Sequence, residues 1–256
     1  MADTKDSPVP LEPVRSLSIF FPAYNEQANL PTLIERTVAA VSPLTGDYEI
    51  IIVNDGSKDR TAEVAEELSR KYPQVRLVNH PQNMGYGAAL ISGFAAATKD
   101  AVFFSDSDNQ FDLAEIRQFW DLIGTNRAVV GYRIKRADPW MRKVNAFCWG
   151  RLIRLLFGFK IKDLDCAFKM FRRSDVAGLT LASRGATLTA ELMARLHGRG
   201  VRWVQVGVHH YPRQAGVQTG AKLKVILKAF VDLFKLSGRL RRESAQAQRA
   251  KKTEPQ

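Results

Sequence analysis

The chain has 256 residues, of which 45% are hydrophobic and 25% are charged. This length and composition are typical of one large globular domain, or of one domain with an appendage, and they exclude a wholly disordered or collagen-like chain. Lysine and arginine number 38 against 26 acidic residues, which gives a net charge of +12, and a positive charge of this size attracts polyanions such as nucleic acid, an acidic membrane surface or a phosphorylated substrate.

The N-terminal segment predicts neither a signal peptide nor a membrane anchor. Residues 1–15 are polar and proline-rich and lack an apolar stretch, so we expect them to be disordered. No uninterrupted apolar run approaches the roughly 18 residues that span a bilayer. The chain has two cysteines, Cys148 and Cys166, which suits a reducing compartment. We therefore expect a cytoplasmic protein that is either soluble or peripheral on the cytoplasmic face of a membrane.

The first half of the chain alternates short apolar runs with helical patterns. The apolar runs predict strands at 17–22, 48–53, 75–79, 101–106 and 127–132. Apolar residues at three- and four-residue spacing predict the intervening helices at 29–41, 59–72, 85–98 and 112–123. This alternation predicts an α/β fold with a mostly parallel sheet that helices cover on both faces.

Polar side chains follow three of these predicted strands. Glu26 comes after the first strand, Asp55 after the second, and the sequence DSDNQ (106–110) after the fourth. In an open parallel sheet the ligand site lies beyond the carboxyl ends of the strands. One such acid could equally be a helix cap, but three together favour a functional site at this edge.

The DSDNQ segment predicts a metal site. Asp106 and Asp108 can both reach one hard divalent cation, and Gln110 can add a carbonyl oxygen. Mg²⁺ or Mn²⁺ bound by two carboxylates usually keeps positions open for substrate phosphates. A calcium EF-hand is excluded, because its required glycine and glutamate positions hold Phe111 and Arg117.

Other nucleotide-binding motifs are missing from the sequence. No G-x-G-x-x-G follows the first predicted strand and no G-x-x-x-x-G-K-[ST] occurs, which disfavours dinucleotide binding and P-loop chemistry. Gly85 and Gly87 precede a predicted helix and favour close packing of that helix on the sheet. The first strand also lacks the glycine-rich loop of nucleotidyltransferases.

Four segments in this order resemble one family. FPAYNE (21–26), VNDGSKDRT (53–61), NMGYGAAL (83–90) and DSDNQFD (106–112) are similar to the motifs of inverting family 2 glycosyltransferases of GT-A fold, and within them to the dolichol- or polyprenyl-phosphate sugar synthases. The resemblance implies that one set of residues binds the base and ribose of a nucleotide-sugar: Pro22, Tyr24, Glu26, Val53 and Asp55. It implies that a second set surrounds the diphosphate and its metal: Asp106, Ser107, Asp108 and Gln110.

The second half of the chain carries most of the positive charge. Residues 133–162 hold nine basic residues against one acid, and residues 221–256 hold ten against three. Apolar residues interleave with these basic ones at about 139–159 and at 221–242, which predicts two basic amphipathic helices in a membrane interface. The alternative for the first is a helix packed on the sheet with its basic edge in water. We expect residues 16–220 to form the GT-A domain and 243–256 a disordered tail.

The same resemblance extends into this half. It implies that Asp165 in DLDCAFK (163–169), Glu191, Arg213 and Lys222 stand at positions that the polyprenyl-phosphate synthases use, with Arg213 and Lys222 binding the nucleotide-sugar. The sequence departs from the commoner family pattern at Cys166 and Ala167. Arg133 follows a predicted strand, and arginine forms paired hydrogen bonds to phosphate. The resemblance implies that Arg133 and Arg142 bind the acceptor phosphate.

The resulting hypothesis is metal-dependent transfer of a hexose, mannose or glucose, from a GDP- or UDP-sugar to a polyprenyl (dolichyl) phosphate at an anionic membrane surface. Asp108, Arg133 and Asp165 are its candidate catalytic residues. A phosphate acceptor needs no strong base, whereas a hydroxyl acceptor would need one, for which Asp165 or Asp163 is the candidate.

Two alternatives remain in different classes. One is a soluble family 2 transferase that acts on a sugar, diacylglycerol or protein hydroxyl. The other is a nucleic-acid-binding protein, which the absence of a zinc-finger pattern and the apolar setting of the basic residues disfavour, so we expect no nucleic-acid partner. None of the four histidines has a partner at metal-ligand spacing, and we expect them to be structural. The sequence gives no indication of the oligomeric state.

Overall fold

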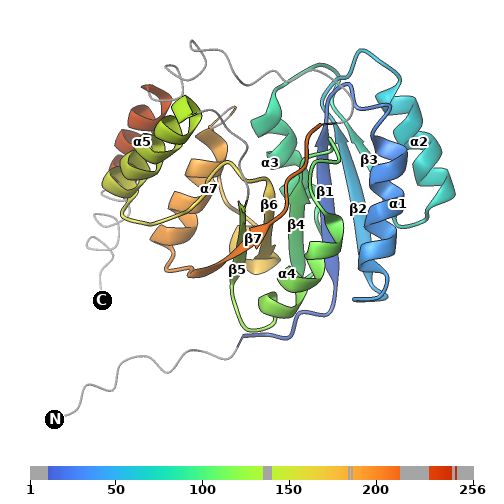
Figure 1. Ribbon diagram of the computed structural model, residues 1–256, viewed down its shortest axis with the longest axis horizontal. Helices are drawn as coiled ribbons and strands as arrows, with labels where there is room; N and C mark the ends of the chain where they lie inside the picture. Colours follow the sequence, from blue (N-terminus) through green and yellow to red (C-terminus); the bar gives the residue numbers. More distant parts are fainter. Residues whose placement is uncertain are drawn as a thin grey trace.

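The structure is a computed structural model that describes residues 11–134, 140–183, 185, 187–213, 231–243 and 246, with the backbone alone for 140–148. Its centre is a twisted sheet with helices packed around it (Figure 1). Lys222 and most of the predicted tail lie outside the described residues, as does the side chain of Arg142.

The described residues form one seven-stranded sheet in the order β3-β2-β1-β4-β6-β5-β7. The strands are β1 Leu17–Ala23, β2 Tyr48–Asn54, β3 Val75–Asn79, β4 Ala101–Ser105, β5 Ala128–Arg133, β6 Phe168–Arg172 and β7 Trp203–Val208. Six of them run parallel, and β6 runs antiparallel between β4 and β5. The predicted α/β fold with a mostly parallel sheet is confirmed.

The strands of the first half are apolar along almost their whole length because both faces of the sheet are covered. Every residue of β1, β2 and β4 is buried, as is typical of parallel strands between two layers. Phe20, Phe94, Phe104 and Phe171 form a ring cluster on one face. The five predicted strands coincide with β1 to β5 to within a residue or two.

The helices of the first half follow the predicted pattern. They are α1 Leu30–Val41, α2 Thr61–Lys71, α3 Tyr86–Ala96 and α4 Ile116–Ile123, the last preceded by a 3₁₀ turn at Leu113–Glu115. α3 packs against β1 and β2, and α4 packs against β5 and β6. Asp112 caps the 3₁₀ turn by accepting a hydrogen bond from the backbone N–H of Ala114 at 3.1 Å, which fixes the direction of the chain after β4.

The second half adds four described helices. They are α5 Trp140–Phe157, α6 Arg173–Val176, α7 Thr187–Gly198 and a helix at 231–243. In Figure 1, α5 and helix 231–243 lie at the left beyond α7. Two ion pairs attach helix 231–243 to α7. Arg239 binds the buried Glu191 of α7 at 2.8 Å, and Arg195 of α7 binds Glu243 at 2.8 Å.

The antiparallel direction of β6 has a consequence for the site. Ser105 at the carboxyl end of β4 pairs with Phe168 at the start of β6. The segment before β6 therefore arrives at the edge where the parallel strands end. Residues about 60 positions after the DSDNQ segment are brought to the same edge by this reversal.

Candidate active site

Four loops meet at the carboxyl edge of the sheet. We name the acid loop (106–110), the 163–166 turn before β6, and the arm (209–213) that follows β7. The loop 83–86, which leads into α3, completes the edge. Hydrogen bonds and charge interactions connect all four. The loops contain six of the residues that the sequence predicts for the site: Asp106, Ser107, Asp108, Gln110, Asp165 and Arg213.

The acid loop is held by the backbone of its neighbours. Ser107 Oγ donates to the carbonyl oxygen of Pro22 at 2.8 Å. Asn109 adopts the left-handed conformation at φ 57°, and its Nδ2 donates to the carbonyl oxygen of Asn29 at 2.9 Å. Asparagine tolerates this conformation better than most residues. The loop is thus fixed to β1 and to the start of α1.

Asp106 and Asp108 form the electrostatic centre of the loop. Burial and the nearby charge of Asp108 raise the pKa of Asp106 to about 7, against the opposing effects of Tyr86, Lys169 and Arg133. Tyr86 Oη donates to Asp106 Oδ1 at 3.0 Å. Two neighbouring carboxylates that repel each other provide a favourable position for a cation.

The electrostatic surroundings of Tyr86 include a third acid near the acid loop. Desolvation of the hydroxyl group raises the pKa of Tyr86 well above its ordinary value although its ring is partly exposed, and the charges of Asp106, Asp165 and Asp108 add to the increase. Asp165 therefore lies within electrostatic range of the acid loop, as predicted for a site residue, although 59 positions separate it from Asp106. Tyr86 is a site residue that the sequence prediction missed, even though it lies inside the NMGYGAAL motif.

The described side chains alone supply too few ligands to complete the coordination of a metal ion. Among the described residues, no three histidine, cysteine, aspartate or glutamate side chains group as a metal site. Two carboxylates with open positions fit Mg²⁺ or Mn²⁺, which usually retain water and substrate phosphate as further ligands. Asp106 and Asp108 therefore fit a cation that a diphosphate helps to hold.

Gln110 joins the acid loop to the arm, and its role as a metal ligand stays a prediction. The side-chain Nε2 of Gln110 donates to the backbone carbonyl oxygen of Tyr211 at 2.8 Å. The backbone carbonyl oxygen of Gln110 accepts from the backbone N–H of Tyr211 at 2.7 Å. Phe111 and His210 form an antiparallel bridge beside this pair. Glu115 accepts two further bonds from His209, one from its N–H at 2.9 Å and one with Nδ1 at 2.7 Å. Gln110 thus attaches the arm to the acid loop.

The arm brings Arg213 into the site. Arg213 Nη2 binds Glu26 Oε1, and its Nη1 lies 3.7 Å from Asp108 Oδ2. Glu26 is buried, and its backbone N–H donates to Thr61 Oγ1 at 2.8 Å. The structure therefore brings together Arg213, Glu26 and Asp108, which lie in three separate sequence motifs.

Asp55 holds the loop 83–86 through hydrogen bonds to its backbone. Its carboxylate accepts from the backbone N–H groups of Met84 and Gly85 at 2.8 Å each, and it pairs with His80 Nδ1 at 2.8 Å. Gly85 has φ +93°, a conformation that favours glycine. His80 Nε2 also bonds Ser92 Oγ at 2.8 Å, so this histidine has a structural partner on each side.

The other residues predicted for base and ribose binding divide into two kinds. Pro22 and Val53 are buried within β1 and β2, where they stand opposite each other in register. Only their backbone could face a ligand. Tyr24 follows β1 and is exposed, so its ring is available at the edge.

Arg133 is tied to a carboxylate of the 163–166 turn. Its Nε and Nη2 donate to Asp163 at 2.6 and 2.8 Å, the paired geometry that guanidinium and carboxylate favour. Burial would lower the pKa of Arg133, but the hydrogen bonds and charge of Asp163 raise it above its ordinary value. Arg133 was predicted to bind phosphate, and Asp163 orients it at the predicted edge.

Glu191 does not join these residues. It is fully buried in α7, and it accepts from the backbone N–H groups of Ala182 and Ser183 at 3.1 and 2.6 Å as well as from Arg195. Its contacts hold the chain before α7 and helix 231–243. The structure assigns Glu191 to the architecture of the second half.

The structure is an α/β protein in which the acid loop, the 163–166 turn and the arm meet at the carboxyl edge of the sheet. Residues 18–179 match the family described as Glycosyl transferase family 2. The chain belongs to this family.

Solved structures support the same fold. The chain is similar to glucosyl-3-phosphoglycerate synthase from Mycobacterium tuberculosis with Mn²⁺, uridine diphosphate and phosphoglyceric acid, at 20% identity and TM-score 0.66, covering 88% of this chain and 79% of that one. It is also similar to that enzyme with Mn²⁺, UDP-glucose and phosphoglyceric acid, at 21% identity and TM-score 0.62, covering 88% and 80%. A further structure, a mycobacterial protein, matches at 22% identity and TM-score 0.60, covering 78% and 68%.

Within the described part of the chain, no helix is both long and apolar enough to cross a membrane. The predicted peripheral attachment and cytoplasmic location stay predictions.

Proposed function

We propose that this glycosyltransferase moves a hexose from a nucleotide diphosphate sugar to an acceptor that binds beside the 163–166 turn, with inversion at the anomeric carbon. The observation that carries the proposal is the Asp106–Asp108 pair of the acid loop, where desolvation of Asp106 and the charge of Asp108 raise the pKa of Asp106 to about 7. Such a pair favours a divalent cation, and the similar mycobacterial enzyme was solved with Mn²⁺ and UDP-glucose.

The donor side of the reaction rests on the acid loop. Asp106 and Asp108 would hold Mg²⁺ or Mn²⁺, which when bound stabilises the charge that develops on the leaving diphosphate. Tyr86 orients the Asp106 carboxylate through its 3.0 Å hydrogen bond. Arg213 lies beside Asp108 and is the nearest described cation of the arm that could exchange its carboxylate partners for a phosphate.

The acceptor side rests on Arg133. A guanidinium has five N–H donors, and Asp163 accepts from two groups of Arg133, which fixes the plane of the remaining donors. An acceptor phosphate bound by those donors would be held in line with the sugar, and positioning of this kind lowers a barrier by roughly 7–11 kcal/mol. Arg142 and Lys222 stay proposed phosphate ligands that lie outside the described side chains.

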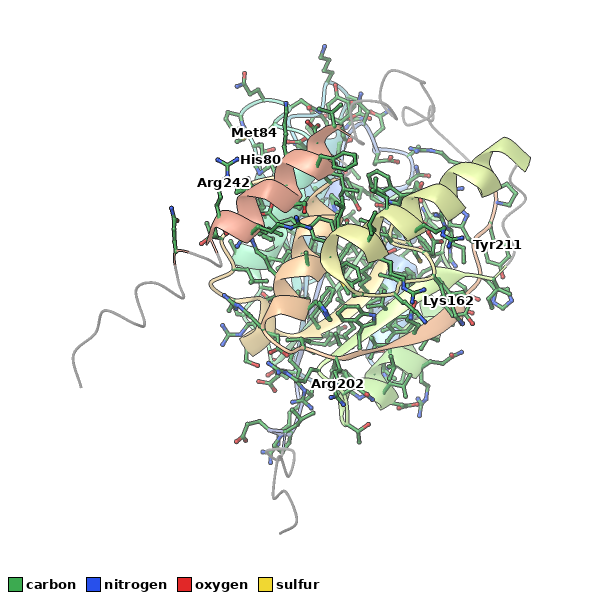
Figure 2. The ribbon with its side chains drawn as sticks, turned by 90° about the vertical axis from the view of Figure 1, so that its left-hand side faces the viewer. His80, Met84, Lys162, Arg202, Tyr211 and Arg242 are labelled. Atoms are coloured by element: carbon green, nitrogen blue, oxygen red, sulfur yellow. The ribbon has the colours of Figure 1, made fainter. Side chains whose placement is uncertain are left out.

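For the acceptor, our first candidate is a polyprenyl phosphate at an anionic membrane surface. Its support is an exposed apolar set on α5 and helix 231–243, where Leu155, Val231 and Phe234 are 78%, 53% and 55% exposed. The exposed Arg151 and Arg154 flank Leu155. Figure 2 looks onto these two helices, with Arg242 near one end of helix 231–243. Apolar side chains beside basic ones suit an interfacial surface.

The second candidate is a water-soluble hydroxyl acceptor that carries an acidic group. The similar mycobacterial enzyme, which was solved with phosphoglyceric acid, supports this candidate more directly than the first. Asp165, exposed and within electrostatic range of the acid loop, would then serve as the general base that a hydroxyl requires.

One assay separates the two candidates and tests the function itself. The purified full chain is given UDP-glucose or GDP-mannose with Mn²⁺, and either a short polyprenyl phosphate in detergent or 3-phosphoglycerate. Transfer to the lipid alone selects the first candidate, and transfer to phosphoglycerate alone selects the second. If neither these donors nor other nucleotide-sugars bind or react, the proposed function is wrong.

Vesicle binding tests the membrane surface separately. We expect Leu155→Ser combined with Phe234→Ser to weaken cosedimentation with anionic vesicles by about 30-fold or more, because each exposed apolar side chain contributes about 1–2 kcal/mol when buried. Leu11→Ser is the matched control, since Leu11 is also exposed but lies before β1. Equal binding by the double variant would remove the support for a lipid acceptor.

A further inference from the structure

A lysine lies in the middle of the sheet beneath the active site. Lys169 belongs to β6, where it pairs with Phe104 of β4 and Val130 of β5, and its side chain is fully buried. Lysine is almost never fully buried unless it is paired. The sequence prediction gave this residue no role.

The ammonium group of Lys169 binds the backbone of the 163–166 turn. Nζ donates to the carbonyl oxygen of Leu164 at 3.0 Å and to that of Cys166. These two carbonyls alternate along the turn with Asp163 and Asp165. Lys169 therefore binds the turn at two backbone positions: Leu164, which lies between Asp163 and Asp165, and Cys166, which follows Asp165.

Keeping a charge here is unfavourable for folding. Burial lowers the pKa of Lys169, and the neighbouring Cys166, Asp163 and Asp165 oppose that effect. The desolvation of a buried ammonium costs several kcal/mol, and apolar residues of similar volume often replace buried charges with no loss of stability. The surroundings would accept such a residue, since the ring of Phe104 lies 5.8 Å from Nζ. Stability alone therefore does not account for a lysine at this position.

We propose that Lys169 is a positioning residue for the reaction. By holding the 163–166 turn from inside the core, it places Asp163 where it orients Arg133 at 2.6 and 2.8 Å and keeps Asp165 beside the acid loop. The assignment of a role in transfer rests on the proposed function, whereas the holding of the turn does not.

The same strand offers a matched control. Arg172, four residues away from the turn-facing end of β6, is also buried and also binds backbone carbonyls, those of Ile123, Gly124 and Asn126 at 2.9 to 3.0 Å. It does so at the opposite edge of the sheet. Arg172→Met removes the same kind of interaction without touching the active site.

The test compares Lys169→Met, Lys169→Gln and Arg172→Met with the wild-type chain. For Lys169→Met we expect kcat to fall about 30- to 100-fold while the Kd for UDP with Mn²⁺ changes less than about threefold, since misplacement of reacting groups by about 1 Å has an effect of that size. We expect its Tm to fall no further than that of Arg172→Met, because both substitutions leave buried backbone carbonyl groups without their donor. Lys169→Gln should be intermediate in kcat, because its amide can still donate to one carbonyl.

Hydrogen exchange gives a readout that is independent of turnover. In Lys169→Met, amides of residues 160–168 should exchange faster than in the wild type, while those around the acid loop stay protected. Arg172→Met should lower Tm and leave both kcat per folded molecule and exchange at 160–168 unchanged. If Lys169→Met does not fold, the same comparison is made with Lys169→Gln.

The outcomes are distinct. Wild-type kcat and wild-type exchange in the Lys169 variants would overturn the proposal, and so would a joint loss of Tm, UDP binding and kcat like that of a general folding defect. A wild-type chain that transfers no sugar would refute the proposed function, and faster exchange at 160–168 would then still decide whether Lys169 holds the turn.

Discussion

The two edges of the sheet treat carboxylates in opposite ways. At the amino edge, burial acts to raise the pKa of Glu49, but hydrogen bonds from Ser18, Thr98 and Arg76 outweigh it and lower the pKa. At the carboxyl edge, burial and a neighbouring acid raise the pKa of Asp106. The protein therefore stabilises the charge of Glu49 with its own donors, whereas the charge of Asp106 is disfavoured and a bound cation would balance it.

Buried cations on β6 extend the comparison. Lys169 and Arg172 both bind backbone carbonyls, and burial lowers the pKa of each. The chemistry is the same, and only the location differs. Arg172 closes the amino edge around loop carbonyls, whereas Lys169 holds a turn that carries two acids. The difference indicates that the amino edge serves stability and the carboxyl edge serves function.

The largest test of this difference is Asp108→Asn. We expect sugar transfer with Mn²⁺ to fall by about 10²- to 10³-fold, because one carboxylate of the cation site is lost. Thermal unfolding should occur at the same or a higher temperature, since the substitution removes repulsion with Asp106. Initial rates and a circular-dichroism melt measure both. Transfer at the wild-type rate would contradict the metal assignment.

Glu49→Ala should have the reverse profile. Its carboxylate accepts bonds from Ser18 Oγ, Thr98 N–H and Arg76 Nε at 2.6 to 2.8 Å, and truncation leaves these donors without their acceptor. We expect unfolding in urea to require about 2–4 kcal/mol less free energy, with unchanged affinity for UDP and Mn²⁺. Glu35→Ala, in an exposed pair with Lys71, is the control and should have little effect. A large loss of nucleotide affinity in Glu49→Ala would break the comparison.

The pH dependence of stability sharpens the same point. The pKa of Glu49 is lower in the folded protein than its ordinary value of 4.5, so its contribution is present above about pH 4.5 and is lost as pH falls through the lower folded value. Glu49→Gln should therefore reduce the decline in unfolding free energy between roughly pH 5 and pH 3. Urea titrations at several pH values measure this decline, and an unchanged slope would argue against a lowered pKa.

The smallest expected effect belongs to Tyr86→Phe. It removes the 3.0 Å hydrogen bond to Asp106 and leaves the ring in place. We expect Mn²⁺ in the presence of UDP to bind about three- to tenfold more weakly, in line with about 1 kcal/mol for one hydrogen bond, with no change in Tm. Calorimetric titration tests this value. Unaltered binding would show that Asp106 needs no orientation by Tyr86.

The sequence predicted the parallel half of the fold well, because fully buried strands are apolar throughout. It did not predict β6, where Lys169 and Arg172 interrupt the apolar pattern in FKMFRR. Because two buried cations interrupt its apolar residues, the spacing of apolar and polar residues in β6 does not distinguish it from a helix or a loop. The burial of both residues becomes intelligible only with the carbonyls that they bind.

The location of the site was predictable, and its contacts were not. Glu26, Asp106 and Asp108 follow strands, so their common edge follows from the strand direction. Gln110 and Tyr211 are 101 positions apart, and pairing at that distance depends on the path of the arm. Asp163 and Arg133 are 30 positions apart and form an ion pair. The sequence predicted Arg133 as a phosphate ligand but did not predict this partner.

The position of β6 also determines when the site comes into being during folding. Strands β1 to β4 pair with one another and involve no residue beyond the first half of the chain, whereas β6 joins β4 on one side and β5 on the other. During synthesis the N-terminal part of a chain emerges first and can fold first. A nascent chain can therefore fold its first four strands before Lys169, Asp163 and Asp165 are in place. Catalytic competence would arrive with the insertion of one central strand, so a partly folded chain has the acid loop without the groups that would direct an acceptor to it.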